Sequence, residues 1–349
     1  MSGGVLFRTL YGGNTGFGHI RRCLSLASAL HEKGIESVFL LDSLSEDILL
    51  DVKKFKYHSL NEFNSGQYLN SEKVNEEDVI SQCIDKYNIK IVFFDKYSIA
   101  NSLIKNLKKK VSYIAGFDDF GLKNENYDLL IDHNFPHEKE GKNNKVLGGF
   151  EYCVLDSQFK KIKSSIKNKS TQGKINFRLN LFVNLGSGFV GTYEKMILKS
   201  FANLEINNKF NVYWLINNDL SLLNSKDESR FGIRKITYID NMAQFLVSMD
   251  LAIGSCGVNA IERCCMGVPS LVFKTVENQQ RNCHTLISNK LAMPVHNESD
   301  IIDKLNYFHT NPKRLKIESD RCSLSIDGEG AHRVANKIHS ILSLFKAIR

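Results

Sequence analysis

Two stretches of this 349-residue chain join a short apolar run to a glycine-rich turn and then to an amphipathic helix, and this repeated order most constrains the fold. In the first stretch, apolar residues 5–7 precede the glycines of residues 12–18, and apolar residues then recur at helical spacing. In the second, residues 251–253 precede the glycines at 254–257. A buried strand that turns through glycines into a helix is typical of parallel α/β sheets.

Further short apolar runs alternate with helical periodicity in both halves of the chain. They lie at residues 37–41, 89–95, 111–116 and 129–131 in the first half, and at 180–185, 211–216 and 269–273 in the second. This alternation predicts parallel sheets with helices on both faces. We therefore expect two doubly wound, Rossmann-like α/β domains with a ligand cleft between them.

A change in composition places the predicted domain boundary. Residues 160–174 are rich in Lys, Ser, Asn and Gln and have no large apolar groups apart from two Ile, which predicts a linker over residues 157–177. The first domain then spans residues 1–156 and the second spans 178–330. Residues 331–349 show helical periodicity and predict one C-terminal helix that packs across both domains.

Composition excludes several classes of protein. No run of 18 apolar residues occurs, so no membrane-spanning helix is expected. Residues 1–8 show no basic region followed by an apolar stretch, so we expect no secretory signal, a cytoplasmic location and free thiols for the eight cysteines. No His/Cys cluster has zinc spacing, and no metal or other cofactor is expected.

The net charge of +8 comes mainly from lysine, because 12 of the 46 basic residues are Arg and 34 are Lys. Scattered lysines usually solvate a surface. No alternation of basic and aromatic residues and no RNA-recognition motif occurs, so nucleic-acid binding is not expected. The positive field favours an anionic small molecule or, weakly, an anionic membrane surface. The sequence predicts no particular oligomeric state.

The first glycine turn ends in Gly16-Phe-Gly18-His19, at the predicted start of a helix. Exposed amide groups at a helix start attract a phosphate or a developing anion. The helix dipole disfavours an imidazolium there, so a neutral His19 beside an anionic ligand is a candidate general base. The alternative is a glycine turn with a helix-capping histidine. The turn is neither a dinucleotide fingerprint nor a P-loop.

The second half offers three weaker signals. Glu262 follows the glycines at 254–257, where its carboxylate can accept hydrogen bonds from a ribose diol while the helix start faces a diphosphate. Residues 277–282 place amides after a predicted strand, where a base or sugar is commonly recognised. Residues 327–333 end in Arg333, which is long enough to reach a phosphate. The alternatives are a carboxylate that offsets the helix dipole and polar surface loops.

Seven segments, in this order, carry a resemblance to a known family. They are GFGHIRRCLSLA at 16–27, FDDF at 117–120, LLIDHN at 129–134, LGGFEYCVL at 147–155, the glycine turn with Glu262 at 254–262, ENQ at 277–279, and DGEGAHR at 327–333. Together they resemble the PseG/SpsG family of nucleotide-sugar hydrolases, from about residue 5 to residue 335.

The resemblance implies a metal-independent enzyme of the GT-B fold that removes UDP from C1 of a 2,4-diacetamido-2,4,6-trideoxyhexose. It implies that His19 positions and deprotonates the attacking water. The residues that it places on the sugar side are Gly16, Gly18, Arg21, Arg22, Asp95, Tyr97, Asp118 and Asp119. Those on the nucleotide side are Gly186, Ser187, Gly188, Gly257, Val258, Asn259, Glu262, Glu277, Asn278 and Gln279.

Four positions depart from the family pattern and leave the sugar and the reaction open. They are Leu10, Lys96, Phe189 and Val258, where the family usually has Asp, His, Asp and Ser. One alternative is a GT-B glycosyltransferase that uses a UDP-sugar and an acceptor hydroxyl, with residues 55–57 and 108–110 as a candidate acceptor surface. Another is a nucleotide-sugar binding protein without catalysis, and a third is an RNA-binding role for the basic surface.

Overall fold

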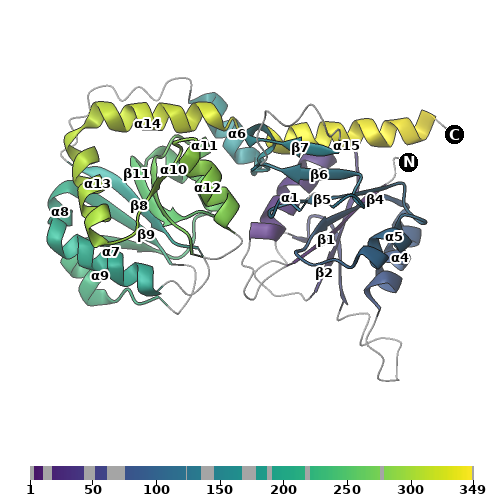
Figure 1. Ribbon diagram of the computed structural model, residues 1–349, viewed down its shortest axis with the longest axis horizontal. Helices are drawn as coiled ribbons and strands as arrows, with labels where there is room; N and C mark the ends of the chain where they lie inside the picture. The colour runs from purple at the N-terminus through teal and green to yellow at the C-terminus, as the bar shows by residue number, and fades with distance from the viewer. Residues whose placement is uncertain are drawn as a thin grey trace. The chain divides into compact units, whose positions relative to one another are not determined.

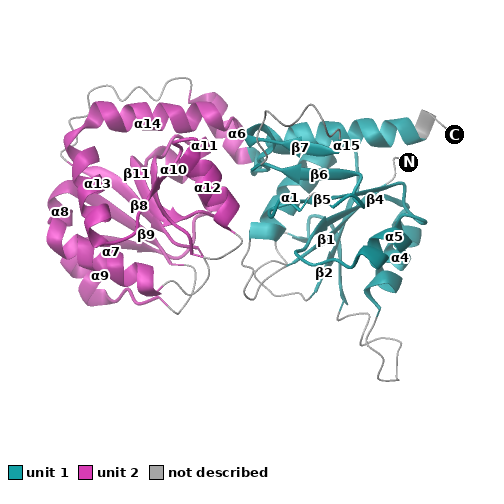
Figure 2. Cartoon of the chain, in the orientation of Figure 1, with its two compact units in different colours: residues 1–157, 329–349 teal, residues 158–328 magenta. Residues whose placement is uncertain are grey.

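The computed structural model describes residues 4–10, 18–42, 52–60, 75–122, 124–134, 145–166, 178–186, 191–216, 221–275 and 279–347. The chain divides into two compact units, one of residues 1–157 and 329–349 and the other of residues 158–328 (Figure 2). Each unit has its own parallel sheet and its own apolar core. No helix among the described residues is long and apolar enough to cross a membrane.

The first unit contains a seven-stranded sheet in the order β3-β2-β1-β4-β5-β6-β7, and all its pairings are parallel. Its strands are β1 (Gly4–Thr9), β2 (Ser37–Leu41), β3 (Lys56–Ser59), β4 (Ile89–Asp95), β5 (Tyr113–Phe117), β6 (Leu129–Asp132) and β7 (Val146–Gly148). The strand order reverses between β1 and β4. Ligands of open α/β sheets bind at such a reversal, beyond the carboxyl ends of the strands.

Helices cover both faces of this sheet (Figure 1). They are α1 (Gly18–His31), α4 (Glu76–Tyr87), α5 (Asn101–Leu107) and α15 (Gly330–Ala347), with a short 3₁₀ turn, η3 (Phe150–Tyr152). Alternate side chains of β1 point to opposite faces. Val5 and Phe7 therefore join the core beneath α1 and α15, whereas Leu6 joins the core beneath α4 and α5.

Helix α15 belongs to the first unit, and its packing across both domains stays a prediction. Its apolar face, which includes Val334 and Ile338, is part of the core that α1 covers. Arg333 Nη1 donates to the Glu151 carbonyl at 2.9 Å. A Cβ at Gly330 would overlap the Cys153 carbonyl oxygen, so a glycine is required for this close approach.

The second unit contains a six-stranded parallel sheet in the order β10-β9-β8-β11-β12-β13, with its reversal between β8 and β11. Its strands are β8 (Leu179–Asn184), β9 (Phe210–Leu215), β10 (Ile233–Ile236), β11 (Leu251–Ser255), β12 (Ser270–Phe273) and β13 (Met293–Pro294). The helices of this unit are α6 (Ser157–Ser165), α7 (Gly191–Leu204), α8 (Ile206–Lys209), α9 (Ser225–Phe231), α10 (Met242–Val247), α11 (Val258–Cys265), α12 (Gln280–Ser288), α13 (Glu298–Thr310) and α14 (Pro312–Ser325).

The first part of the predicted linker is instead helix α6, and residues 167–177 lie outside the described residues. The side chain of Phe159 is buried, and Lys163 Nζ donates to the carbonyl oxygens of Cys265 and Ile326 at 2.8 and 2.9 Å. Burial lowers the pKa of Lys163. These tertiary contacts stabilise a helix in a segment whose composition alone indicated a linker.

Candidate active site

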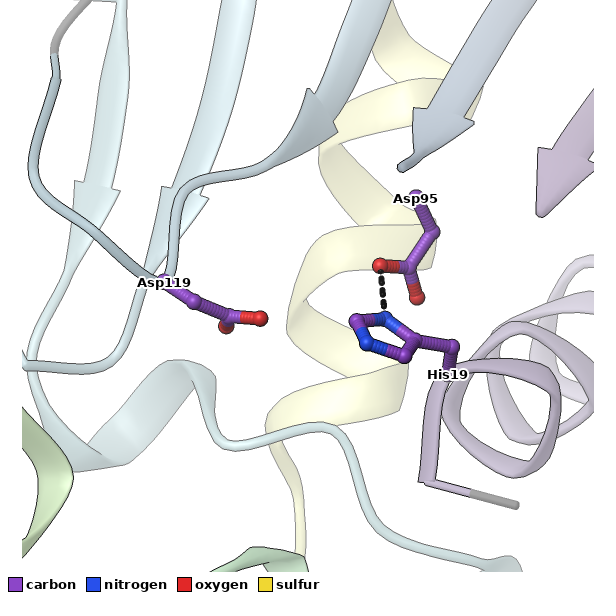
Figure 3. Close-up of side chains that lie close together, drawn as sticks. All are labelled: His19, Asp95 and Asp119. Carbon is purple, nitrogen blue, oxygen red and sulfur yellow. Dashed lines mark hydrogen bonds and ion pairs between the residues drawn. The ribbon is translucent and has the colours of Figure 1, made fainter. Parts of the chain in front are cut away.

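His19 is the second residue of α1 and lies beside the end of β4. Its Nδ1 is 2.6 Å from Oδ1 of Asp95, the last residue of that strand (Figure 3). The two residues meet because β1 leads toward α1 and pairs with β4, with Thr9 opposite Asp95. His19 is only 5% exposed. An ionised carboxylate can only accept a hydrogen bond, so Nδ1 carries the proton, and Nε2 has a lone pair whenever the ring is neutral.

Asp95 is held in its ionised form by Arg22, which lies one turn beyond His19 on α1. Burial by itself would raise the pKa of Asp95, but the charge of Arg22 and the hydrogen bonds from Arg22 and His19 hold it well below its usual range. Arg22 Nε donates to Asp95 Oδ2 at 2.7 Å and Nη2 donates to Oδ1 at 2.5 Å. Asp95 is therefore a fixed negative charge that orients the imidazole.

Arg22 also holds Asp119, which follows β5, in a bidentate pair of 2.7 and 2.8 Å. Its guanidinium lies 4.1 Å from the centre of the Phe117 ring. Burial would raise the pKa of Asp119, and the charge of Arg22 lowers it below the usual range. Figure 3 shows the Asp119 carboxylate directed toward the His19 imidazole. One guanidinium thus joins residues from the ends of two strands.

The ligand atoms of His19, Asp95 and Asp119 lie within 4.8 Å of one another, which raises the question of a metal site. All four carboxylate oxygens already accept hydrogen bonds from Arg22. A divalent cation would have to displace this buried guanidinium and overcome its charge. The donor set therefore fits an ion-pair network and not a metal centre.

Tyr97 connects the histidine to a cavity. Its hydroxyl lies 2.5 Å from His19 Nε2, and the two rings meet edge to face with centroids 4.7 Å apart. When the ring is neutral, Nε2 has a lone pair and the phenol donates to it. Tyr97 lines the cavity whereas His19 lies behind it. The phenol oxygen is thus the polar atom through which the Asp95–His19 pair faces a bound molecule.

The cavity has a volume of about 430 Å³, within the range of small-molecule sites. Aromatic rings and polar groups share its lining, which includes Tyr97, Phe117, Phe120 and Tyr127, and also Lys96, Ser98, Asp118, Asp119 and Asn124. Aromatic faces can contact the C–H groups of a ring, and carboxylate and amide oxygens can accept hydrogen bonds from its substituents. This combination suits a sugar that carries both apolar and amide groups.

A charged cluster beside the cavity was not predicted from the sequence. Arg8 is fully buried in β1 and pairs with Asp42 and with Glu76, whose Oε1 is 2.5 Å from Arg8 Nε. Lys96 Nζ is 3.0 Å from the same Glu76 carboxylate. Burial would raise the pKa of Glu76, but the charge of Arg8 and the hydrogen bond from Lys96 lower it. The sequence signal that could have predicted this cluster is an arginine inside an apolar strand, because a buried charge requires a partner of opposite charge.

In the second unit, the structure brings three of the predicted nucleotide-binding residues near one another. Gly186 follows β8 with a φ of +95°, and a Cβ there would lie 3.6 Å from Ser255 Oγ at the end of β11. Gly257 lies against Gln279, since its Cβ would be 3.2 Å from Gln279 Nε2. Gln279 Oε1 also accepts from the Cys256 amide at 3.2 Å.

Helix α11 begins directly after this turn. Gly257 is its N-cap and supplies no side-chain hydrogen bond, and no acidic residue lies in its first turn, where Val258 and Asn259 are half-buried. The helix start therefore presents amide groups and a positive dipole end, which favour an anion. Glu262 lies one turn further along α11 and is also half-buried.

The structure places some of the remaining predicted site residues near the site and others away from it. Gly18 is the first residue of α1. Arg21 is exposed and takes no part in the contacts that join Arg22 to Asp95 and Asp119. Leu10, one of the departures, donates its amide to the Asp95 carbonyl at 3.3 Å. Five predicted site residues lie outside the described residues, namely Gly16, Ser187, Gly188, Glu277 and Asn278. Phe189, another position that departs from the family pattern, also lies outside them.

No protein-family model matches this chain. An uncharacterized protein of Methanocaldococcus jannaschii is 23% identical over 353 residues, which cover 95% of this chain and 65% of that protein. The chain thus spans slightly less than two thirds of the curated relative's length.

Solved structures match over both units. MurG of Acinetobacter baumannii gives a TM-score of 0.68 at 14% identity, covering 97% of this chain and 99% of that one. The UDP-GlcNAc 2-epimerase of Neisseria meningitidis bound to UDP-GlcNAc gives 0.64 at 10%, covering 96% and 99%. The S. aureus MnaA–UDP structure gives 0.65 at 12%, covering 98% and 97%. The chain therefore has the expected fold, two Rossmann-like α/β domains of the GT-B type.

Proposed function

We propose that this protein hydrolyses a UDP-sugar and releases UDP from C1 of a 2,4-diacetamido-2,4,6-trideoxyhexose, in the biosynthesis of a nonulosonic acid such as pseudaminic acid or of a surface polysaccharide. The observation that carries the proposal is the buried Asp95–His19 pair beside the cavity. The resemblance of the sequence to the PseG/SpsG family supports hydrolysis. The UDP and UDP-GlcNAc complexes among the structural neighbours support UDP-sugars as the substrate class.

In this mechanism His19 is the general base. A water near the Tyr97 hydroxyl loses a proton to Nε2, either directly after Tyr97 turns aside or through the phenol oxygen. The water oxygen bonds to C1 as the bond from C1 to the diphosphate oxygen breaks, and UDP leaves with the electron pair. Asp95 stabilises the imidazolium that forms, as in other Asp–His pairs.

The leaving group explains why one base suffices. Ordinary glycosidases need a second carboxyl group as an acid, because an alkoxide is a poor leaving group. A nucleoside diphosphate leaves readily as an anion, and donors that stabilise its charge can replace the acid. We assign this role to the amide groups at the start of α11 and at Gly186, with Glu262 holding the ribose and Gln279 near the base or sugar.

The cavity of the first unit is assigned to the sugar. Tyr97 and Phe120, whose rings lie 5.2 Å apart, provide apolar faces for the C6 methyl group and the ring. Asp118 and Asn124 provide oxygens that can accept from the acetamido N–H groups. Neither acetamido group is charged, so this binding needs no additional counter-ion.

The test is phosphorus and proton NMR of the purified protein with UDP-2,4-diacetamido-2,4,6-trideoxy-β-L-altropyranose in oxygen-18 water. Hydrolysis by attack at carbon gives unlabelled UDP and a free sugar labelled at C1. His19→Asn should lower kcat by about 10²–10⁴-fold, the usual contribution of a general base. His58→Asn is the matched control, since His58 on β3 forms a second histidine–tyrosine pair in the same unit, 2.7 Å from the Tyr87 hydroxyl. A near-normal rate in His19→Asn would refute the assignment of the base.

A GT-B glycosyltransferase is the second candidate. Phe120 and Leu122 line the cavity and are 42% and 72% exposed, which provides an apolar surface for an acceptor beside the base. In that case the Asp95–His19 pair would deprotonate an acceptor hydroxyl instead of water. UDP release that requires an added acceptor would favour the transferase, whereas release in buffer alone would favour the hydrolase. Binding of UDP without turnover under either condition would favour a non-catalytic protein.

A further inference from the structure

Two cysteines of the second unit meet beside the turn that precedes α11. Cys256 lies in this turn and is fully buried, and Cys283 lies in the first turns of α12 and is half-buried. All eight cysteines of the chain lie in the described residues, and the other six are buried, as is Cys256. Cys283 is therefore the thiol that a reagent in solution can reach most easily.

The two segments are already joined by several contacts. The thiols of Cys256 and Cys283 influence each other's pKa more than any other group does, raising that of Cys256 and lowering that of Cys283. The Cys256 amide donates to Gln279 Oε1 at 3.2 Å, and the Cys256 carbonyl accepts from Asn282 Nδ2 at 2.5 Å. Asn282 directly precedes Cys283 in α12. The polar contacts of Gln279 and Asn282 thus hold the backbone of Cys256 against the helix that carries Cys283.

The environment distinguishes Cys283 from the buried thiols. The neighbouring Cys256 thiol lowers the pKa of Cys283; burial opposes this effect and the Lys274 ammonium supports it. Burial raises the pKa of Cys83 to about 11 and that of Cys265 to about 12. Because the thiolate is the reactive form, Cys283 has the largest reactive fraction at neutral pH among these three.

We propose that Cys256 and Cys283 are a redox-active pair that a peroxide converts to a reversible disulfide, which tethers the turn before α11 to α12. The Cys283 thiolate attacks one oxygen of hydrogen peroxide, forms a sulfenic acid and releases hydroxide. The Cys256 sulfur then attacks the sulfenic sulfur, and the displaced hydroxide leaves as water with the Cys256 proton. The two sulfurs lose two electrons, which reduce the peroxide, and a dithiol reverses the reaction.

The disulfide also affects the nucleotide site, and this consequence rests on the proposed function. Gly257, the N-cap of α11, directly follows Cys256 and lies against Gln279. Disulfide formation requires the two sulfur atoms to approach to about 2.05 Å, so we expect the turn and α12 to move closer and the amide groups at the helix start to be displaced. We expect oxidation to raise the Kd for UDP by about tenfold, since small displacements in a binding site are costly.

The experiment treats the full-length protein with hydrogen peroxide, blocks the remaining thiols and identifies cross-linked peptides by mass spectrometry. Calorimetry measures UDP binding before oxidation, after oxidation and after dithiothreitol. We expect a cross-linked peptide that joins Cys256 to Cys283 and a reversible loss of affinity. Cys283→Ala should abolish both effects and leave the affinity of the reduced protein unchanged. Cys83→Ala, at a buried thiol of the first unit, is the matched control and should retain both effects.

The outcomes separate this inference from the proposed function. A sulfinic acid at Cys283 without a cross-link, or no oxidation at all, would overturn the proposal. A cross-link that leaves the Kd for UDP unchanged would refute control of the nucleotide site. If the reduced protein binds no UDP, the proposed function fails, while the mass of the cross-linked peptide still decides whether the disulfide forms.

Discussion

Replacing Asp95 by asparagine tests the active-site argument most directly, because the two side chains have the same shape. Arg22 can still donate to the amide oxygen of the new side chain. The amide nitrogen then faces His19 Nδ1, where the carboxylate now lies at 2.6 Å. An amide nitrogen can only donate, so Nδ1 must accept and the ring proton moves to Nε2. The lone pair that should accept the proton of water is thereby lost.

The expected loss of activity follows from this change of tautomer. General base catalysis contributes about 10²–10⁴-fold, and the wrong tautomer in an Asp–His pair costs up to about 10⁴-fold, so kcat should fall within that range with little change in KM. Removing one member of a buried ion pair costs about 3–5 kcal/mol. Arg22 keeps both hydrogen bonds to Asp119, so we expect a loss of unfolding free energy below about 3 kcal/mol.

The assays are steady-state release of UDP and urea unfolding of the same preparations. Asp119→Asn is the matched control, since it removes the other carboxylate from Arg22 without altering the proton on His19. We expect the two variants to lose similar unfolding free energy and only Asp95→Asn to lose most of its kcat. Equal kcat values for the two variants, or a kcat within about threefold of the parent for Asp95→Asn, would refute the role of the Asp95–His19 pair.

Three further predictions follow from individual contacts. Tyr97→Phe removes the hydroxyl that lies 2.5 Å from His19 Nε2. Because one hydrogen bond is lost, kcat should fall about tenfold. An unchanged kcat and pH–rate profile would contradict this role of the hydroxyl. Gly330→Ala places a methyl group against the Cys153 carbonyl oxygen and should reduce the unfolding free energy by about 1–3 kcal/mol. Urea unfolding measures this loss, and an unchanged midpoint would contradict the close packing. Asp95 and Asp119 have pKa values below the usual range, so their ion pairs stabilise the fold above the unfolded-state pKa of about 3.9 and lose this contribution as pH falls toward the folded-state values. The difference in stability between the parent and Asp95→Asn should therefore shrink below about pH 4 in circular-dichroism titrations, and a constant difference would contradict the linkage.

The local pattern of apolar residues and glycine turns was sufficient to predict many of the strands and helix starts. Strands β2 and β4 begin and end at the predicted residues, because a run of buried apolar residues between polar ones specifies a strand by itself. Glycine turns marked the starts of α1 and α11 for a similar local reason. Helix α6 was missed because its stability comes from tertiary contacts of Lys163 and Phe159, which the composition of the segment does not reveal.

The candidate site also combines features that local sequence predicts with features that depend on tertiary contacts. The sequence by itself determined two doubly wound units and a histidine at the start of a helix, because both depend on residues that are neighbours along the chain. Arg22 is 73 residues from Asp95 and 97 from Asp119, and only the order of strands around β1 brings their charges together. Sheet topology likewise places Tyr97 against His19 Nε2 and Glu76 against Arg8. It also brings the turn that holds Cys256 against helix α12. Hydrophobic periodicity specifies which face of an element is buried, whereas the register and order of strands decide which polar groups meet at their ends.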